Sequence, residues 1–261
     1  MKISVIIHTY NAEKFLDRVL KSVSDFDEVL ICDMHSEDRT IEIAERYNCR
    51  VIYHENVGFA DPARSFSISQ ATYEWVLMVD ADELVTSALR NYLYNFIQEK
   101  PDAGGLRIPR KNYQLGRFMH SYYPDYILRF FKKEGTIWPA TVHSQPQIKG
   151  EVLYIPKKRK DLAFIHLANE PIRMTIEKMN IYTDFEIKRE KRKNKNYGYL
   201  NLIFEPFFRF LRFYIFKGGF RDGKPGFIWA SEYAYYKFIT IAKALESKVK
   251  PEDMDKELRE E

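Results

Sequence analysis

Three carboxylates follow a short apolar run in the first third of the chain. The run is Trp75 to Val79, and Asp80, Asp82 and Glu83 come directly after it, with Ala81 between the two aspartates. A short apolar run bounded by polar residues is typical of a central parallel strand, and ligands of open α/β sheets gather at the carboxyl ends of such strands. Carboxylate oxygens are ligands that magnesium and manganese prefer. These acids therefore form a candidate site for a divalent metal ion.

A purely structural role would explain the same acids. Thr86 is placed to cap a helix over residues 86–98, and carboxylates just before a helix interact favourably with its dipole. Short acidic motifs also occur often by chance. Taken alone, the three acids leave both interpretations open.

The elements around this site predict an α/β fold. Apolar runs at residues 3–7, 28–32, 50–53 and 75–79 predict four strands, and apolar residues at helical spacing predict helices between them. Such an alternation implies right-handed crossovers and a parallel sheet, with the loops after the strands on one edge. That edge would collect polar side chains from several loops: Thr9, Tyr10, Asn11, Asp33, Arg64, Asp80 and Asp82.

A dinucleotide-binding oxidoreductase has a similar order of elements, but its phosphate-binding loop is missing here. The loop after the first strand is His8-Thr9-Tyr10-Asn11, which has no glycine and does not let the backbone approach a pyrophosphate closely. A nucleoside diphosphate can instead be held by a metal ion on Asp82, with Asp33 accepting from the base or ribose and Arg64 supplying positive charge. Taken singly, each residue also has a plain structural explanation. Asp33 would be the residue that ends a strand, and Arg64 would be a solvated residue of a helix.

Composition and cysteine content narrow the class of protein. A chain of 261 residues is long enough to bury a full α/β core. Its two cysteines, Cys32 and Cys49, lie in or beside apolar runs, and we expect them to be reduced in a cytoplasmic protein. The sequence has no signal-peptide pattern and no apolar stretch long enough to span a bilayer. We therefore expect a protein that is neither secreted nor membrane-spanning. The basic segments come without a recognised nucleic-acid motif, so we expect no nucleic-acid partner.

Further candidate residues lie in the middle of the chain. Residues 104–108 predict a strand, and the following Arg110-Lys111-Asn112-Tyr113 reads as a basic, polar loop. Asp125 follows in an aromatic segment, and residues 127–132 after it predict a strand of alternating pattern. Two histidines beside apolar segments, His143 and His166, are each either satisfied core residues or groups that complete a metal or phosphate site.

The last third of the chain has a different character. Apolar residues at three- and four-residue steps predict a helix over 172–185 that runs into a basic segment at 188–195. Residues 199–216 are rich in phenylalanine but include Arg209 and Arg212, a pattern that suits a helix lying in a membrane interface and not one that spans the membrane. An intramolecular or dimer contact is the alternative. We therefore divide the chain into a domain at 1–170 and a helical extension at 171–261.

Together these segments resemble a known family. The order Ile3 to Asn11, Asp33, Arg64 and Asp80-Ala81-Asp82 is similar to the nucleotide-sugar half of family 2 glycosyltransferases. Later segments resemble the lipopolysaccharide core β-1,4-glucosyltransferase subgroup: Arg110-Lys111-Asn112-Tyr113, Tyr123-Pro124-Asp125-Tyr126, Arg129-Phe130, Val142-His143 and the Phe- and Arg-rich segment that ends at Gly223. The similarity covers nearly the whole chain.

The resemblance implies a fold, an activity and partners. The fold would be of the GT-A type, an α/β fold with a mainly parallel sheet, followed by a helical, membrane-interface-like extension. The enzyme would bind a UDP-sugar, use magnesium or manganese, and transfer a hexose, expected to be glucose, with inversion. Its acceptor would be a cell-envelope glycolipid or polysaccharide such as lipopolysaccharide core, and it would lie on the cytoplasmic face of the inner membrane. The competing function is a nucleotide- or carbohydrate-binding module of the same fold without turnover.

The resemblance also assigns residues to roles. Asp80 would approach the ribose or the sugar, and Asp82 would coordinate the metal. The remaining predicted donor residues would line the uridine pocket: Thr9, Tyr10, Asn11, Asp33 and Arg64.

The sequence departs from the family pattern at two places. Many relatives carry a Glu-Asp pair on the acceptor side, whereas the pairs here, Glu37-Asp38 and Glu252-Asp253, lie at a helix start and in the tail. Asp125 is our candidate for the catalytic base, and a turn residue is its alternative role. The second departure is Met34-His35-Ser36, where relatives often have a small or acidic residue followed by glycine.

Overall fold

The computed structural model divides the chain into two compact units. We call Met1–Tyr113 with Tyr123–Ala168 the sheet unit, and Gln114–Tyr122 with Asn169–Glu261 the helical unit. The structure describes residues 1–57, 61–139, 145–167, 172–192 and 196–249, with the backbone alone for residue 61 and residues 189–192. The division into domains at residue 170 stays a prediction.

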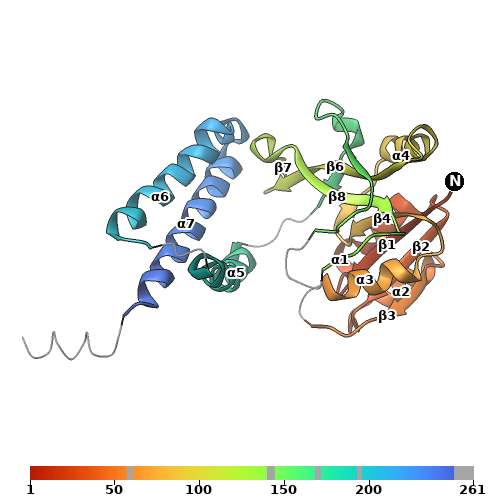
Figure 1. The fold of residues 1–261 in the computed structure, drawn as a ribbon, viewed down its shortest axis with the longest axis horizontal. Coiled ribbons are helices and arrows are strands. Elements are labelled where there is room, and N and C mark those ends of the chain that lie inside the picture. The colour runs from red at the N-terminus through yellow and green to blue at the C-terminus, as the bar shows by residue number, and fades with distance from the viewer. Residues whose placement is uncertain (58–60, 140–144, 168–171, 193–195, 250–261) are drawn as a thin grey trace, which may run out of the picture. The chain divides into compact units, whose positions relative to one another are not determined.

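Strands and helices alternate through the first part of the sheet unit (Figure 1). Its first part contains β1 (Ile3–Thr9), α1 (Glu13–Val23), β2 (Glu28–Asp33), α2 (Thr40–Arg46), β3 (Arg50–Tyr53), α3 (Asp61–Gln70) and β4 (Trp75–Asp80). Its second part contains β5 (Glu83–Leu84), α4 (Ser87–Glu99), β6 (Ala103–Gln114), β8 (Asp125–Lys132), β9 (Glu151–Tyr154), the 3-10 turn η2 (Lys160–Leu162) and β10 (Phe164–His166). The four strands predicted first are confirmed.

The strands form one sheet in the order β3-β2-β1-β4-β8-β6-β10-β5. The first four strands are parallel to one another, as predicted, and β6 is parallel to both β9 and β10. Strand β8 runs antiparallel to its neighbours β4 and β6, and β5 runs antiparallel to β10. The fold is therefore α/β with a mainly parallel sheet, as expected.

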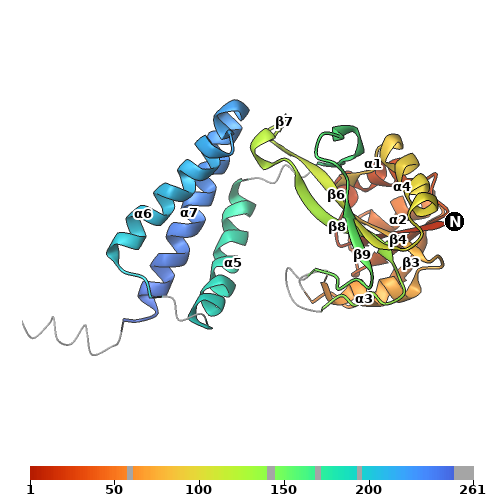
Figure 2. The same ribbon diagram turned by 45° about the horizontal axis from the view of Figure 1, so that its top comes forward.

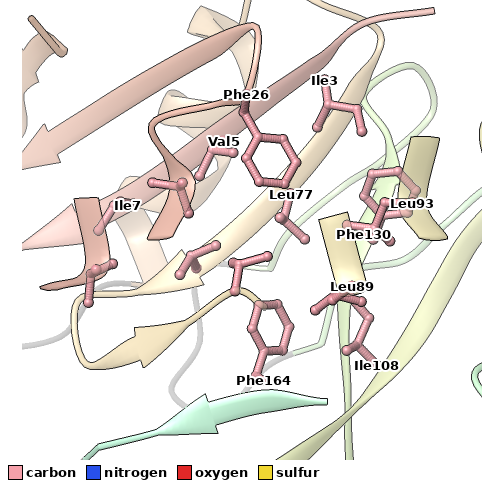
Figure 3. Close-up of a cluster of buried hydrophobic side chains, with 14 of the residues drawn as sticks. Ile3, Val5, Ile7, Phe26, Leu77, Leu89, Leu93, Ile108, Phe130 and Phe164 are labelled. Carbon is pink, nitrogen blue, oxygen red and sulfur yellow. The ribbon is translucent and has the colours of Figure 1, made fainter. Parts of the chain in front are cut away.

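Apolar residues of the central strands pack on both faces of the sheet. Ile3, Val5 and Ile7 of β1 belong to one buried cluster, which includes side chains of α1 and α4 (Figure 3). Ile6, between them in sequence, belongs to a second cluster that includes Trp138. Because successive side chains of a strand point to opposite faces, burial of both faces requires the continuous apolar runs seen in the sequence.

One local prediction is confirmed and another is wrong. Thr86 caps α4, and its Oγ1 accepts a hydrogen bond from the amide of Leu89 at 3.1 Å. Residues 110–113, expected in a loop, instead continue strand β6, which pairs with β8 on one side and β10 on the other. Their side chains are consequently held by a sheet and not by a surface loop.

The helical unit is built mainly from three helices. These are α5 (Ile172–Arg192), α6 (Tyr199–Leu211) and α7 (Lys224–Glu246), and both α5 and α6 pack along α7 (Figure 2). Shorter elements are β7 (Arg117–Phe118), the 3-10 turns η1 (His120–Tyr122) and η4 (Gly219–Asp222), and the π-helical turn η3 (Arg212–Phe216). Within the described ranges, none of the helices combines the length and apolar character needed to cross a membrane.

A buried carboxylate fastens residues 114–122 to the rest of the helical unit. Asp222 accepts hydrogen bonds from the backbone amides of His120 and Ser121, from the hydroxyl of Ser121 and from the ring of His120, at 2.6 to 3.0 Å. The first turn of α7 packs closely against η4 at Gly226, where a Cβ would lie 1.9 Å from the carbonyl oxygen of Gly219. Only glycine fits at that position.

Candidate active site

The ends of β1 and β2 form the first part of the candidate site. Thr9 and Asp33 are neighbours in the parallel register, and the Thr9 hydroxyl donates to Asp33 Oδ1 at 2.6 Å. Ser36 donates to the same carboxylate from its hydroxyl at 2.6 Å and from its backbone amide at 2.8 Å. Asp33 is fully buried, so these three donors fix its orientation. A carboxylate has about four acceptor positions, so one position of Asp33 has no donor within this cluster.

The turn beside this pair contains two more of the predicted residues. Tyr10 is half exposed, and Asn11 has a positive φ of 49°. The Asn11 side-chain oxygen accepts from the amide of Glu37 at 2.8 Å, and this contact ties the two loops together. His35, in the segment where relatives often have glycine, has a φ of 60°, a left-handed conformation that favours glycine.

Asp80, at the end of β4, lies between two arginines. Arg129 of β8 donates from Nη2 to Asp80 Oδ2 at 2.7 Å, and Arg64 of α3 has its Nη2 3.9 Å from Oδ1. Both guanidinium groups lie over the ring of Trp138, 4.4 Å away for Arg64 and 5.8 Å for Arg129. Burial by itself would raise the pKa of Asp80, but the charges of Arg129 and Arg64 lower it below its ordinary value. Asp80 is therefore ionised at neutral pH.

A shared arginine joins two further acids. Arg110 donates from Nη1 to Glu83 Oε1 at 3.0 Å, and from Nε and Nη2 to Asp125 Oδ2 at 2.8 and 2.6 Å. Glu83 is fully buried, and it also accepts from the backbone amide of Asp80 at 3.2 Å. Asp125 keeps part of its surface exposed, so of these two acids it is the one that a substrate can reach.

Asn112 links Asp125 to His166. Its Nδ2 donates to Asp125 Oδ2 at 3.1 Å, and its Oδ1 lies 2.7 Å from His166 Nδ1. An amide oxygen can only accept, so His166 Nδ1 carries a proton, and Nε2 lies toward Asp82 Oδ2 at 3.4 Å. Burial lowers the pKa of His166, but the hydrogen bond and charge of Asp82 raise it by more.

Asp82 and His166 are the residues best placed to hold a divalent cation. The imidazole has one nitrogen oriented by a side-chain oxygen and the other beside a carboxylate, an arrangement common among metal-ligating histidines. The described residues contain no group of three or more His, Cys, Asp or Glu side chains suited to a metal ion. Water and substrate phosphates would therefore complete the coordination, as is usual for magnesium.

The structure brings most predicted residues to one edge of the sheet. Thr9, Asp33 and Asp80 end three adjacent parallel strands, and this follows from the predicted strand order. Asp125 begins β8, whose strand was predicted from residue 127 onward but whose antiparallel direction was not. His143 lies outside the described residues.

Two side chains of the site were not identified from the sequence. Asn112 was placed in a loop, and Trp138 was not singled out at all. Leu106 and Ile108 on either side of Arg107 give a period-two signal for a strand, but Pro109 and the basic residues after it hide its continuation to Asn112. Trp138 lies between Ile137 and Pro139 in a short segment where no local pattern marks it.

Comparisons with known proteins agree with this architecture. The family model described as "Glycosyl transferase family 2" matches residues 4–220. The lipopolysaccharide core biosynthesis glycosyltransferase LpsC of Rhizobium meliloti is 27% identical over 255 residues, which are 93% of this chain and 92% of LpsC.

A second relative is also similar in structure. The poly(ribitol-phosphate) beta-N-acetylglucosaminyltransferase TarS of Staphylococcus aureus is 29% identical over 175 residues, 61% of this chain and 30% of TarS. A crystal structure of S. aureus TarS matches 86% of this chain with a TM-score of 0.51 and 21% identity. That match spans 46% of the TarS chain, less than half, and it shows a shared fold alone.

The resemblance seen in the sequence motifs is therefore confirmed, together with the GT-A-like fold. Because the family match includes both strand ends and acids of the candidate site and covers most of the chain, the protein belongs to glycosyl transferase family 2.

Proposed function

We propose that the protein transfers a hexose, with glucose as the first candidate, from a UDP-sugar to a cell-envelope glycolipid or polysaccharide such as lipopolysaccharide core. The transfer would invert the anomeric configuration, require magnesium or manganese, and take place on the cytoplasmic face of the inner membrane. The observation that supports this most is the pairing of Asp82 with an oriented His166 at the carboxyl ends of the strands. The similarity to LpsC along nearly the whole chain supports the acceptor class.

The uridine would lie at the ends of β1 and β2. Asp33 has an acceptor position left for the ribose or the base, while Thr9 and Ser36 keep its carboxylate fixed. Tyr10 and Asn11 would form the wall of this pocket. A fixed acceptor discriminates among ligands by the donors that they present, because a buried carboxylate without its partner is costly.

The diphosphate and the sugar would lie toward β4. Arg64 supplies positive charge, and Arg129 Nη1 is buried without a hydrogen-bond partner among the described residues, so it can donate to a ligand. Asp80, held ionised by these arginines, would accept from the ribose or sugar hydroxyls. Asp82 and His166 would hold the metal ion, which, when bound, neutralises charge on the diphosphate leaving group.

Asp125 would act as the catalytic base. Its Oδ2 is occupied by Arg110 and Asn112, whereas its Oδ1 accepts no hydrogen bond from the residues that the structure describes. Oδ1 would take the proton of the acceptor hydroxyl as that oxygen attacks the anomeric carbon from the side opposite the diphosphate. The bond between the anomeric carbon and the diphosphate oxygen breaks, and its electron pair leaves with UDP.

Release of UDP tests this proposal. The full chain would be incubated with UDP-glucose, manganese and lipopolysaccharide truncated in its core, and both UDP and the anomeric configuration of the product would be measured. We expect UDP release that requires both acceptor and metal, and a product of inverted configuration. Tight UDP-sugar binding without release over a panel of donors and acceptors would instead favour the non-catalytic module.

A further inference from the structure

Helix α6 turns its apolar side chains outward. None of its 13 described residues is buried, and five large apolar side chains are between 47 and 66% exposed. We call these five residues the α6 stripe: Leu200, Ile203, Phe204, Phe207 and Phe208. Their spacing of three and four residues places them on one face of the helix. In a water-exposed helix that face is normally the buried one.

The opposite side of α6 is the one that packs within the helical unit. Leu202 packs against a small buried cluster that includes Ile241 and Ala244 of α7. Glu205 pairs with Lys237 of α7 at 3.2 Å. Phe210 contacts the ring of Phe227, also in α7. The polar contacts thus face inward, whereas the apolar stripe is exposed among the described residues of the helical unit. Beyond the helix, Phe216 is also exposed, at 83%.

The exposed charge of the segment that carries the stripe is positive. Between residues 199 and 224 there are five cationic side chains, and all except the partly exposed Arg209 are exposed: Arg209, Arg212, Lys217, Arg221 and Lys224. The two carboxylates of this stretch are Glu205, which pairs with Lys237, and Asp222, which is buried with its four donors. A partner for this surface should therefore be apolar in its interior and anionic at its boundary.

We propose that the α6 stripe docks the protein on the surface of an anionic lipid bilayer. The stripe would enter the boundary between headgroups and acyl chains, and the neighbouring cations would contact the headgroup phosphates. An apolar helix face beside arginine and lysine matches this surface in both respects, whereas a second copy of the same stripe would bring like charges together. This proposal concerns the helical unit and does not depend on the sugar transfer proposed above.

Sedimentation of the full chain with lipid vesicles tests the proposal. The vesicles would contain phosphatidylglycerol and phosphatidylethanolamine, with pure phosphatidylcholine for comparison. We expect binding to the anionic vesicles that weakens as salt is added. The double variant Ile203→Glu with Phe207→Glu should lose more than about tenfold in affinity. Ile137→Glu, which makes the same kind of exchange at one 64% exposed site of the sheet unit, is the control and should bind as the parent does.

Two further variants separate the apolar and cationic contributions. Arg212→Gln with Lys217→Gln should weaken binding to the anionic vesicles by about fivefold for each charge removed. Phe208→Trp should report insertion directly, through a blue shift of tryptophan emission on adding anionic vesicles. Circular dichroism would establish that each variant is folded.

Two outcomes would overturn the proposal. One is a folded parent protein that does not bind anionic vesicles, or that binds them as well after both glutamates are introduced. The other is a parent that is dimeric without lipid and becomes monomeric in the double variant while vesicle binding is unchanged. The stripe would then be an interface between copies of the chain.

Discussion

The ring of His166 points its Nδ1 proton at the side-chain oxygen of Asn112, 2.7 Å away. The other end of that amide donates to Asp125, so one side chain orients both the imidazole beside Asp82 and the candidate base. The Asn112 amide uses its nitrogen for the carboxylate of Asp125 and its oxygen for the ring of His166, because a carboxylate accepts hydrogen bonds from a donor. The proposed metal side and acceptor side of the site are thereby held in a fixed relation.

Replacing Asn112 should weaken metal binding. Asn112→Ala removes the acceptor that fixes the His166 ring, and loss of such a supporting contact typically lowers metal affinity by about 10- to 100-fold. Titration with manganese, followed by electron paramagnetic resonance in the presence of UDP, measures this directly. Asn91→Ala, at an exposed site of α4, is the control and should match the parent. Equal affinity for manganese in Asn112→Ala and the control would show that Asn112 does not support the metal site.

Replacing Asp125 should affect turnover more than donor binding. Asp125→Asn keeps the shape of the side chain but cannot take a proton, so kcat should fall by about 10²- to 10⁴-fold. The affinity for UDP, measured by calorimetry, should stay within about threefold, because the base contacts the acceptor and not the nucleotide. Asp102→Asn, at an exposed turn, serves as control. A variant with nearly full kcat would show that another group is the base.

Asp222 should matter for stability and not for chemistry. Asp222→Asn leaves a single acceptor oxygen for four donors, and we expect a loss of about 2–4 kcal/mol in the free energy of unfolding. Urea denaturation at neutral pH measures it. Asp184→Asn breaks an exposed ion pair with Lys243 and should cost less than about 1 kcal/mol. Equal midpoints for the two variants would contradict the structural role of Asp222.

The same carboxylate predicts a dependence on pH. Burial by itself would raise the pKa of Asp222, but its hydrogen bonds with Ser121 and His120 lower it below its ordinary value. A carboxyl with a depressed pKa in the folded state stabilises the protein above its unfolded pKa of about 3.9, and this stabilisation is lost as the pH falls through the folded pKa. The difference in unfolding free energy between the parent and Asp222→Asn should therefore shrink as the pH falls through the folded pKa of Asp222. A difference that stays constant until the protein unfolds in acid would contradict this role of Asp222.

Local patterns predicted the parallel half of the sheet well. The runs around Ile3 and Trp75 are continuous and apolar because both faces of these strands are covered, and the order of strands and helices then fixes which ends meet. Thr86 was likewise recognisable as a cap from its position alone. Residues whose environment is set by their neighbours in sequence were predictable.

Long-range pairing was beyond what the sequence revealed. Asn112 contacts Asp125 and His166, which are 13 and 54 residues further along the chain. The register of antiparallel β8 and of the short β10 decides that meeting, and neither register leaves a local signature. The same holds for the stacking of Arg64 and Arg129 on Trp138, which joins three separate segments.

Calorimetric titration with UDP, with and without manganese, tests the central claim most directly. The parent protein and Asp82→Ala would be compared, with Asp102→Ala as a control of equal charge change. We predict that manganese tightens UDP binding in the parent and in the control, and that this gain disappears in Asp82→Ala while the metal-free affinity remains. A folded parent that binds no UDP under either condition, or a manganese effect that survives in Asp82→Ala, would contradict the account.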